Sequence, residues 1–204
     1  MSLIIFAQVF TVCLLGAMSP GPSMALVINN AIFKGRHNGI LTAIGHGIGI
    51  AVYATFAVLG IGLVIKTNIL IFNSLKMLSI IFLIYIGIKS ILNKQKINLK
   101  KDNIKENTVS FVQGFSISIL NPKILIWFIA IYSQFMSADN SLIFNVCLIS
   151  IAGIIDASWY IILTLAVTTA SAMRFFETKI EFIQKIQGFL FLALGLGLLV
   201  NLLI

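Results

Sequence analysis

Six long apolar runs divide the chain, and short polar gaps separate them. The runs cover about 3–32, 40–65, 69–92, 111–136, 142–170 and 182–204. Each is long enough for a helix to cross the hydrocarbon core of a bilayer, which takes roughly 20 residues. The pattern therefore predicts an all-α integral membrane protein with six transmembrane helices joined by short loops.

The composition supports the same class. Of the 204 residues, 59% are hydrophobic and 10% are charged, and the mean hydropathy is +1.08. A soluble domain carries roughly 45–50% apolar and about 25% charged residues, so a soluble enzyme, a disordered chain and a disulfide scaffold are excluded. Cys13 and Cys147 both lie in apolar runs and are expected to be buried free thiols. We interpret residues 1–204 as a single membrane domain.

Basic residues concentrate in alternate gaps. The first, third and fifth gaps hold Lys34, Arg36, Lys94, Lys96, Lys100, Lys101, Lys105, Arg174 and Lys179, whereas the second holds only Lys66 and the fourth and both tails hold none. Because loops rich in Lys and Arg stay in the cytoplasm, both termini are predicted to lie outside. The net charge of +8 forms no basic face of the kind that binds nucleic acid. The expected partner is the lipid bilayer, with no nucleic acid.

The longest gap, 93–110, is rich in Lys and Asn and separates two halves of three spans each, 1–92 and 111–204. With an odd number of spans in each half, a structural repeat has to be inverted in the membrane. Weak internal similarity supports such a 3+3 inverted repeat, with Ser19-Pro20 matching Asn121-Pro122, Tyr53 matching Tyr160, and Lys76, Ser79, Phe82 and Leu83 matching Lys185, Gly188, Phe191 and Leu192.

All three prolines, Pro20, Pro22 and Pro122, lie inside predicted spans. A proline within a helix removes a backbone donor and clashes with the carbonyl four residues back. Each should therefore free one carbonyl, and such groups are tolerated at membrane depth only where protein, water or a ligand satisfies them. The carbonyls expected to be freed belong to Gly16, Met18 and Ser118.

Spans 1 and 4 are predicted to be broken helices. Ser19 and Asn121 each precede a proline, as a preferred N-cap residue precedes a preferred first helical residue. A helix starting there would present free N–H groups and roughly half a positive charge, and half-helices of this kind bind anionic substrate groups in transporters. A simple kink is the alternative, but two matching breaks favour a site. Its candidate residues are Ser19, Pro20, Gly21 as a hinge, Pro22, Ser23, Asn121, Pro122 and Lys123.

Three ionisable residues lie inside the spans near these breaks. Asp156 is near the centre of span 5, and an intramembrane carboxylate is costly enough to be a functional hypothesis by default. Lys123 opposes the local helix dipole, so Asp156, a substrate carboxylate, or each of them in turn is expected to compensate it. His46 lies only six residues into span 2 and is either a satisfied polar residue or a proton carrier.

Further residues in the spans have structural interpretations. Gly45 and Gly49 are spaced for close helix packing. Trp127 and Trp159 are expected to pack in the core rather than to line a pocket. Asn29 and Asn30 are either polar residues at a helix end or part of an inner vestibule, and the sequence leaves both interpretations open.

These residues also carry a family resemblance that covers nearly the whole chain. Ser19-Pro20-Gly21-Pro22-Ser23, Gly35-Arg36 and the glycine-rich start of span 2 resemble the opening signature of the LysE/RhtB family of bacterial amino-acid exporters. Gly114 followed by Leu120-Asn121-Pro122-Lys123 resembles its second motif, and Asp156 matches an acidic residue common in span 5. Ser133 departs from the family's proline before Gln134-Phe135, Ser79 from a common glycine, and His46 occurs in only some relatives.

The resemblance implies a secondary transporter of the bacterial cytoplasmic membrane that exports amino acids or similar small metabolites, driven by proton antiport and without a cofactor. Threonine, homoserine, lysine and branched-chain amino acids all stay open as substrates, and so does assembly into a homo-oligomer. One alternative is export of another small solute or a metal cation, for which Cys13, Cys147 and His46 make a poor ligand set. An intramembrane enzyme is the other, but no catalytic motif supports it.

Overall fold

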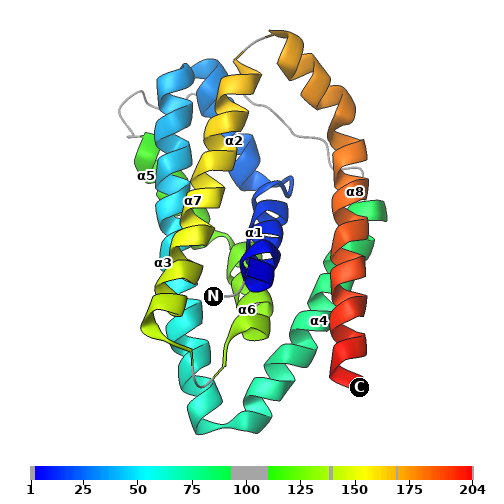
Figure 1. Ribbon diagram of the computed structural model, residues 1–204. Coiled ribbons are helices and arrows are strands. Elements are labelled where there is room, and N and C mark those ends of the chain that lie inside the picture. Colours follow the sequence, from blue (N-terminus) through cyan, green and yellow to red (C-terminus); the bar gives the residue numbers. More distant parts are fainter. Residues whose placement is uncertain (1–2, 93–109, 138–139, 169, 204) are drawn as a thin grey trace.

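The computed structural model describes residues 3–92, 110–137, 140–168 and 170–203, and helices make up nearly all of these ranges (Figure 1). The helices are α1 (Leu3–Ala17), α2 (Pro22–Phe33), α3 (Arg36–Thr67), α4 (Ile69–Leu92), α5 (Ser110–Leu120), α6 (Pro122–Phe135), α7 (Leu142–Val167) and α8 (Ala170–Leu203). The axes of α1 and α2 are bent by 66° and those of α5 and α6 by 62°. With each bent pair counted as one span, the described residues contain six candidate spans, and the all-α prediction is confirmed.

The border between the last two spans differs from the prediction. Because α7 ends at Val167 and α8 begins at Ala170, the expected fifth gap, with Arg174 and Lys179, forms the first turns of α8. This polar segment lacks Gly and Pro and therefore has no strong helix breaker. Of the predicted linker 93–110, only Ser110 lies within the described residues, and it begins α5.

The helix connections alternate between the two ends of the molecule. Those from α2 to α3 and from α7 to α8 lie at one end, whereas those from α3 to α4 and from α6 to α7 lie at the other, together with the C-terminus (Figure 1). The first and fifth gaps, which are basic, therefore share one end. The second and fourth gaps share the opposite end, as six spans require.

Glycines bring α3 close to α5. A Cβ atom at Gly45 would overlap the backbone carbonyl of Phe111, and one at Gly49 would overlap the side chain of Ser118. Gly114 of α5 has the converse role, since a Cβ there would overlap the carbonyl of Thr42 in α3. The predicted close packing at Gly45 and Gly49 is therefore confirmed, and it is a contact within one chain.

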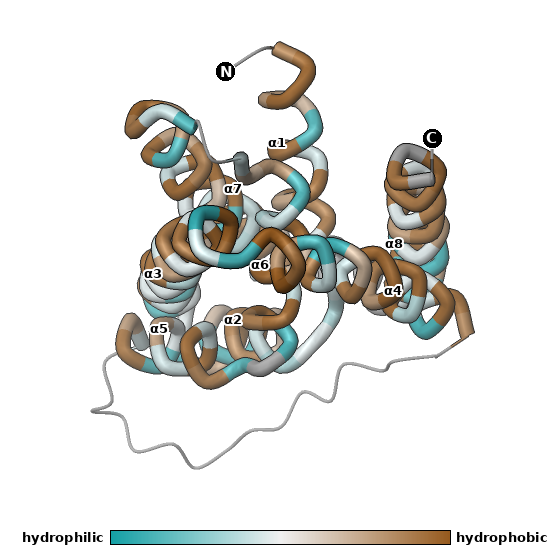
Figure 2. Tube along the Cα trace, turned by 90° about the horizontal axis from the view of Figure 1, so that it is seen from below, coloured by the Kyte–Doolittle hydropathy of each residue, from teal (hydrophilic) through white to brown (hydrophobic). Residues whose placement is uncertain are grey.

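Corresponding spans of the two halves pack against each other. Between α3 and α7, a Cβ at Gly47 would lie 2.8 Å from the carbonyl oxygen of Gly153, and one at Gly153 would lie 3.0 Å from that of Gly47. Gly87 and Gly188 allow the same close approach between α4 and α8. The α4–α8 pair stands to one side of the other helices (Figure 2). The inverted repeat itself stays a prediction.

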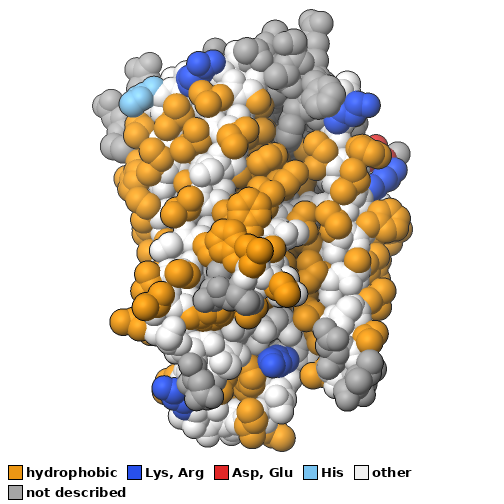
Figure 3. Space-filling view, in the orientation of Figure 1, with side chains coloured by type: hydrophobic (Ala, Val, Ile, Leu, Met, Phe, Trp, Pro, Cys, Tyr) orange, Lys and Arg blue, Asp and Glu red, His pale blue; other side chains and the backbone are white. Residues whose placement is uncertain are grey.

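The outer surface is apolar. Figure 3 shows hydrophobic side chains over the middle of the visible face and Lys or Arg toward its ends. Water-exposed apolar area costs roughly 25 cal/mol per Å², so this surface fits lipid better than water. Among its exposed side chains are Leu59, Leu63, Leu78, Ile154 and Phe189.

Candidate functional site

The break between α5 and α6 has the predicted N-cap. The Oδ1 atom of Asn121 accepts a hydrogen bond from the backbone N–H of Lys123 at 3.1 Å, and Pro122 is the first residue of α6. The carbonyl of Ser118, which Pro122 leaves without its usual donor, accepts instead from the N–H of Asn121 at 3.5 Å. The next carbonyl, that of Ile119, accepts from the hydroxyl of Tyr53. The side chain of Pro122 lies outside the described part of the structure.

The break between α1 and α2 does not have the predicted cap. The new helix begins at Pro22 rather than at Pro20, and its N-cap is Gly21, which has an extended backbone and no capping side chain. The prediction for Ser19 is therefore wrong. A residue before proline is disfavoured in the helical region, and Gly21, which precedes Pro22, is extended, so the helix begins only at the second proline.

This start leaves backbone donors free at the N-terminus of α2. The first N–H of α2 that bonds within the helix is that of Ala25, which donates to the carbonyl of Gly21 at 3.0 Å. Within the described residues, no hydrogen bond is made by the N–H groups of Ser23 or Met24. These groups carry the positive end of the helix dipole.

A side chain of α8 satisfies a backbone carbonyl that the first break leaves without its helical donor. Gln187 is 2% exposed, and its Nε2 atom donates to the carbonyl oxygen of Leu15. The N–H of Ser19, which would have bonded there in a continuous helix, donates to the carbonyl of Gly16 at 3.1 Å. The sequence interpretation missed Gln187. A signal was present, because Gln184 and Gln187 are amides three residues apart in an apolar run.

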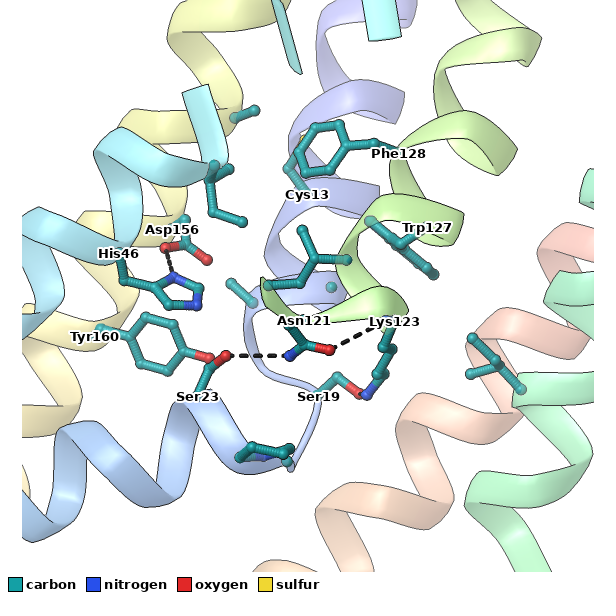
Figure 4. Close-up of a pocket in the computed structure, with 18 of the residues that line it drawn as sticks. Cys13, Ser19, Ser23, His46, Asn121, Lys123, Trp127, Phe128, Asp156 and Tyr160 are labelled. Carbon is teal, nitrogen blue, oxygen red and sulfur yellow. Dashed lines mark hydrogen bonds and ion pairs between the residues drawn. The ribbon is translucent and has the colours of Figure 1, made fainter. Parts of the chain in front are cut away.

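The two breaks meet inside the bundle (Figure 4). The Nζ atom of Lys123 donates to the hydroxyl of Ser19, and the Nδ2 atom of Asn121 donates to that of Ser23 at 3.4 Å. Residues about a hundred positions apart are thus joined directly. This contact agrees with the single site that the two matching breaks predict.

A pocket lies beside these contacts and encloses about 670 Å³ of space, including its open mouth. Its polar side is formed by Ser19, Ser23, His46, Asn121, Lys123 and Asp156, and its apolar side includes Cys13, Ile50, Trp127, Phe128 and Phe191. Trp127 packs in the core as expected, on Phe191 with ring centroids 5.0 Å apart, and it also lines this pocket. Gly21 and Pro22 also line it, whereas Pro20 lines a neighbouring cavity.

His46 and Asp156 form a buried pair. The Nδ1 atom of His46 lies 2.6 Å from Oδ2 of Asp156, and the two residues are only 1% and 5% exposed. Of the two partners considered for Lys123, Asp156 is therefore not the one in the structure, because Lys123 bonds Ser19 instead; a substrate carboxylate stays a prediction. His46 is also deeper than its sequence position suggested. Since α3 begins at Arg36, ten residues earlier, a rise of 1.5 Å per residue places His46 about 15 Å along the helix.

The pairing indicates which nitrogen of a neutral imidazole is available. When Asp156 is ionised and His46 is neutral, the carboxylate only accepts hydrogen bonds, so Nδ1 of His46 carries the proton and Nε2 holds a lone pair. Nε2 is buried and has no hydrogen-bond partner among the described residues. Tyr160 packs edge-on against the ring, with centroids 4.9 Å apart. Because His46 and Tyr160 both line the pocket, Nε2 offers a ligand or a proton an unoccupied acceptor.

Asn30 does not line the pocket. Its side chain is part of a hydrogen-bond network that connects three helices. Its Nδ2 atom donates to the hydroxyl of Thr42 at 2.8 Å and to Oε1 of Gln113 at 2.9 Å. Lys34 donates to the same Gln113 oxygen at 3.2 Å. The ends of α2, α3 and α5 are thereby held together at the basic end of the bundle.

Comparisons with known proteins match nearly the whole chain. The family model described as LysE type translocator matches residues 14–202. The uncharacterized membrane protein YrhP of Bacillus subtilis is 26% identical over 87% of this chain and 90% of its own length. The threonine efflux proteins of Escherichia coli K12 and Salmonella typhimurium are 21% and 22% identical, each over 98% of this chain and 99% of the relative. No solved structure matches the chain significantly.

Proposed function

The chain belongs to the LysE type translocator family, and from this we propose that it exports amino acids or similar small metabolites across the bacterial cytoplasmic membrane by proton antiport. Proteins of this family are transporters, so the protein is not an enzyme. The observation that carries the proposal is the pocket between the two breaks, which combines a lysine, a free backbone donor and a buried His–Asp pair. The relatives named threonine efflux proteins support an amino acid as the cargo.

The pocket offers complementary partners to both charges of an amino acid. Lys123 and the free N–H group of Ser23 suit the carboxylate, because charge-assisted hydrogen bonds are the stronger ones and a helix N-terminus favours anions. The Nε2 lone pair of His46 suits a donor, namely the substrate's ammonium group. The apolar wall is left for the substrate side chain.

The lining of this wall favours an uncharged substrate side chain. Among the described lining residues, Asp156 is the only carboxylate, and His46 already bonds it. A second cation, such as the side chain of lysine, would therefore lie against aromatic and aliphatic groups without a partner, and burying an unpaired charge is costly. We accordingly favour threonine, homoserine or branched-chain amino acids over lysine.

The His46–Asp156 pair supplies a coupling mechanism. With His46 neutral, the pair carries one negative charge and presents the Nε2 lone pair, so it attracts the substrate's ammonium group. A proton arriving at Nε2 makes the pair electrically neutral and removes that acceptor. Proton and substrate therefore compete for one atom, which is what antiport requires. A proton entering from outside displaces the substrate, and substrate loading from the cytoplasm displaces the proton.

We infer an orientation in which the basic gaps face the cytoplasm and both termini face outward. The C-terminus lies at the end of the bundle opposite the basic first and fifth gaps (Figure 1), in agreement with the positive-inside rule. A C-terminal reporter that is active only in the cytoplasm should give no signal. A strong signal would reverse the orientation.

The coupling role is tested by Asp156→Asn. The asparagine oxygen can still accept from Nδ1 of His46, so the variant should insert and fold, but the pair loses its negative charge. In proteoliposomes loaded with amino acid, we expect proton-driven export to be lost while exchange of labelled for unlabelled substrate persists. Asp156→Glu, which restores the charge, should keep partial activity. Full proton-driven export by the Asn variant at normal expression would reject coupling through this pair.

Export of a metal cation is the weaker alternative. Among the described residues, no group of three His, Cys, Asp or Glu side chains is placed to hold a metal ion. Cys13 lines the pocket, but Cys147 does not. No observation favours this function, so amino-acid export stays the proposal.

A further inference from the structure

A second cavity adjoins the first pocket on the side away from His46. It encloses about 800 Å³, including its open mouth, and lies between the first break and helices α4, α6 and α8. Ser19, Ile86 and Lys123 line both cavities. The hydrogen bond from Lys123 to Ser19 therefore lies on the boundary between them.

The second cavity is cationic. Its described lining holds two charged side chains, Lys89 and Lys123, and no carboxylate. Lys89 lies over the ring of Tyr85, with Nζ 5.6 Å from the centroid. The acidic side chains whose placement is described are engaged elsewhere, Asp156 with His46 and Glu181 with Lys185. Two like charges beside one cavity at low dielectric repel each other, so an anion placed between them is favoured.

The position of Lys89 indicates on which side of the membrane the second cavity lies. Lys89 is in the last turn of α4, which leads into the basic gap 93–110, predicted to be cytoplasmic. An exporter loads its substrate from the cytoplasm. The cavity therefore lies between the loading side and the central pocket.

We propose that this second cavity is a loading site for the substrate's carboxylate, which Lys89 binds first and Lys123 then receives. This proposal rests on the export function proposed above. In the structure, Lys123 donates to the neutral hydroxyl of Ser19. A carboxylate is a stronger acceptor for an ammonium group than a hydroxyl, so an arriving substrate replaces Ser19. That exchange opens the boundary between the two cavities.

The test is Lys89→Gln, with Lys76→Gln as the matched control. Lys76 is on the same helix and also lies over an aromatic ring, that of Phe72, with Nζ 4.8 Å from its centroid. It lines neither cavity. In inside-out membrane vesicles, uptake of labelled threonine and leucine corresponds to export. Its initial rate is measured against substrate concentration, and the amount of each variant in the membrane is determined.

For Lys89→Gln we expect KM to rise about threefold to tenfold, with a maximal rate within twofold of the unmodified protein. The rise should shrink at high ionic strength, because salt screens exposed charges. Lys89→Arg should restore the original KM, and Lys76→Gln should not change it. An unchanged KM for Lys89→Gln, or an equal rise for Lys76→Gln, would overturn the loading site alone. Absence of any proton-driven uptake by the unmodified protein would overturn the export function and the loading site together.

Discussion

The break between α5 and α6 is a single residue, Asn121, whereas the break between α1 and α2 takes four, from Met18 to Gly21. The bends are nevertheless similar, 62° and 66°. At the second break, the Asn121 side chain satisfies a donor of the new helix. At the first break, Gly21 has no side chain with which to do so.

Because of this difference, the two breaks contribute different chemical groups to the pocket. The short, capped break satisfies the start of its own helix and contributes a cation, Lys123. The long, uncapped break contributes an unused backbone donor, the N–H of the lining residue Ser23, to the same pocket. Two breaks that look equivalent in sequence therefore have complementary roles in our proposal. Each role can be tested by making one break resemble the other.

The largest effect is expected from removing the cation of the second break. Lys123→Gln keeps a polar side chain but loses the charge that we assign to the substrate carboxylate. We expect at least a tenfold loss of apparent affinity, which corresponds to about 1.4 kcal/mol or more. Lys123→Arg, which keeps the charge, should retain partial activity. The measurement is export rate against substrate concentration in inside-out vesicles, and an unchanged KM for the Gln variant would contradict the assignment.

A smaller effect is expected from capping the first break. Gly21→Asn gives α2 the side-chain acceptor that Asn121 gives α6, and its oxygen competes with the substrate carboxylate for the N–H of Ser23. Thermal stability should stay equal or rise by a few tenths of a kcal/mol, while KM rises about threefold to fivefold.

Gly21→Ala is the control for this variant. The Gly21 backbone is extended, with φ 174°, and an added Cβ would have its nearest neighbour 4.0 Å away, at the carbonyl oxygen of Ser19. Alanine should therefore leave KM unchanged, while stability falls by up to about 1 kcal/mol because alanine is a poorer N-cap residue than glycine. If Ala and Asn raised KM equally, the effect would come from bulk rather than from capping.

Removing the cap of the second break is expected to act on stability, to an extent similar to that of a roughly fivefold change in an equilibrium constant. Asn121→Ala should lower stability by about 1 kcal/mol, measured as a lower midpoint of thermal unfolding in detergent. Asn121→Asp keeps the acceptor for Lys123 N–H and should recover most of that stability. Because Asp places a negative charge beside Lys123, we expect Asn121→Asp to export more slowly than the unmodified protein. Equal stability of all three proteins would show that the cap contributes nothing.

Features that depend on neighbouring residues were predictable from the sequence. The six apolar runs indicated the spans, the prolines indicated two breaks, and Asn121-Pro122 indicated a capped helix start. Hydropathy, proline geometry and capping all act within a few residues, so these features can be predicted from the sequence alone. The prediction failed where two such rules gave different answers, because both Ser19-Pro20 and Gly21-Pro22 can start a helix and α2 begins at Pro22.

The partners of the buried polar groups depended on how the helices pack. Asp156 met His46 rather than Lys123, because the contact of Gly47 with Gly153 holds α3 against α7. Gln187 reached the carbonyl of Leu15 from the far end of the chain. These contacts join residues 110 and 172 positions apart. They are set by the rotation and separation of whole helices. Hydropathy and local propensity contain almost no information about either quantity.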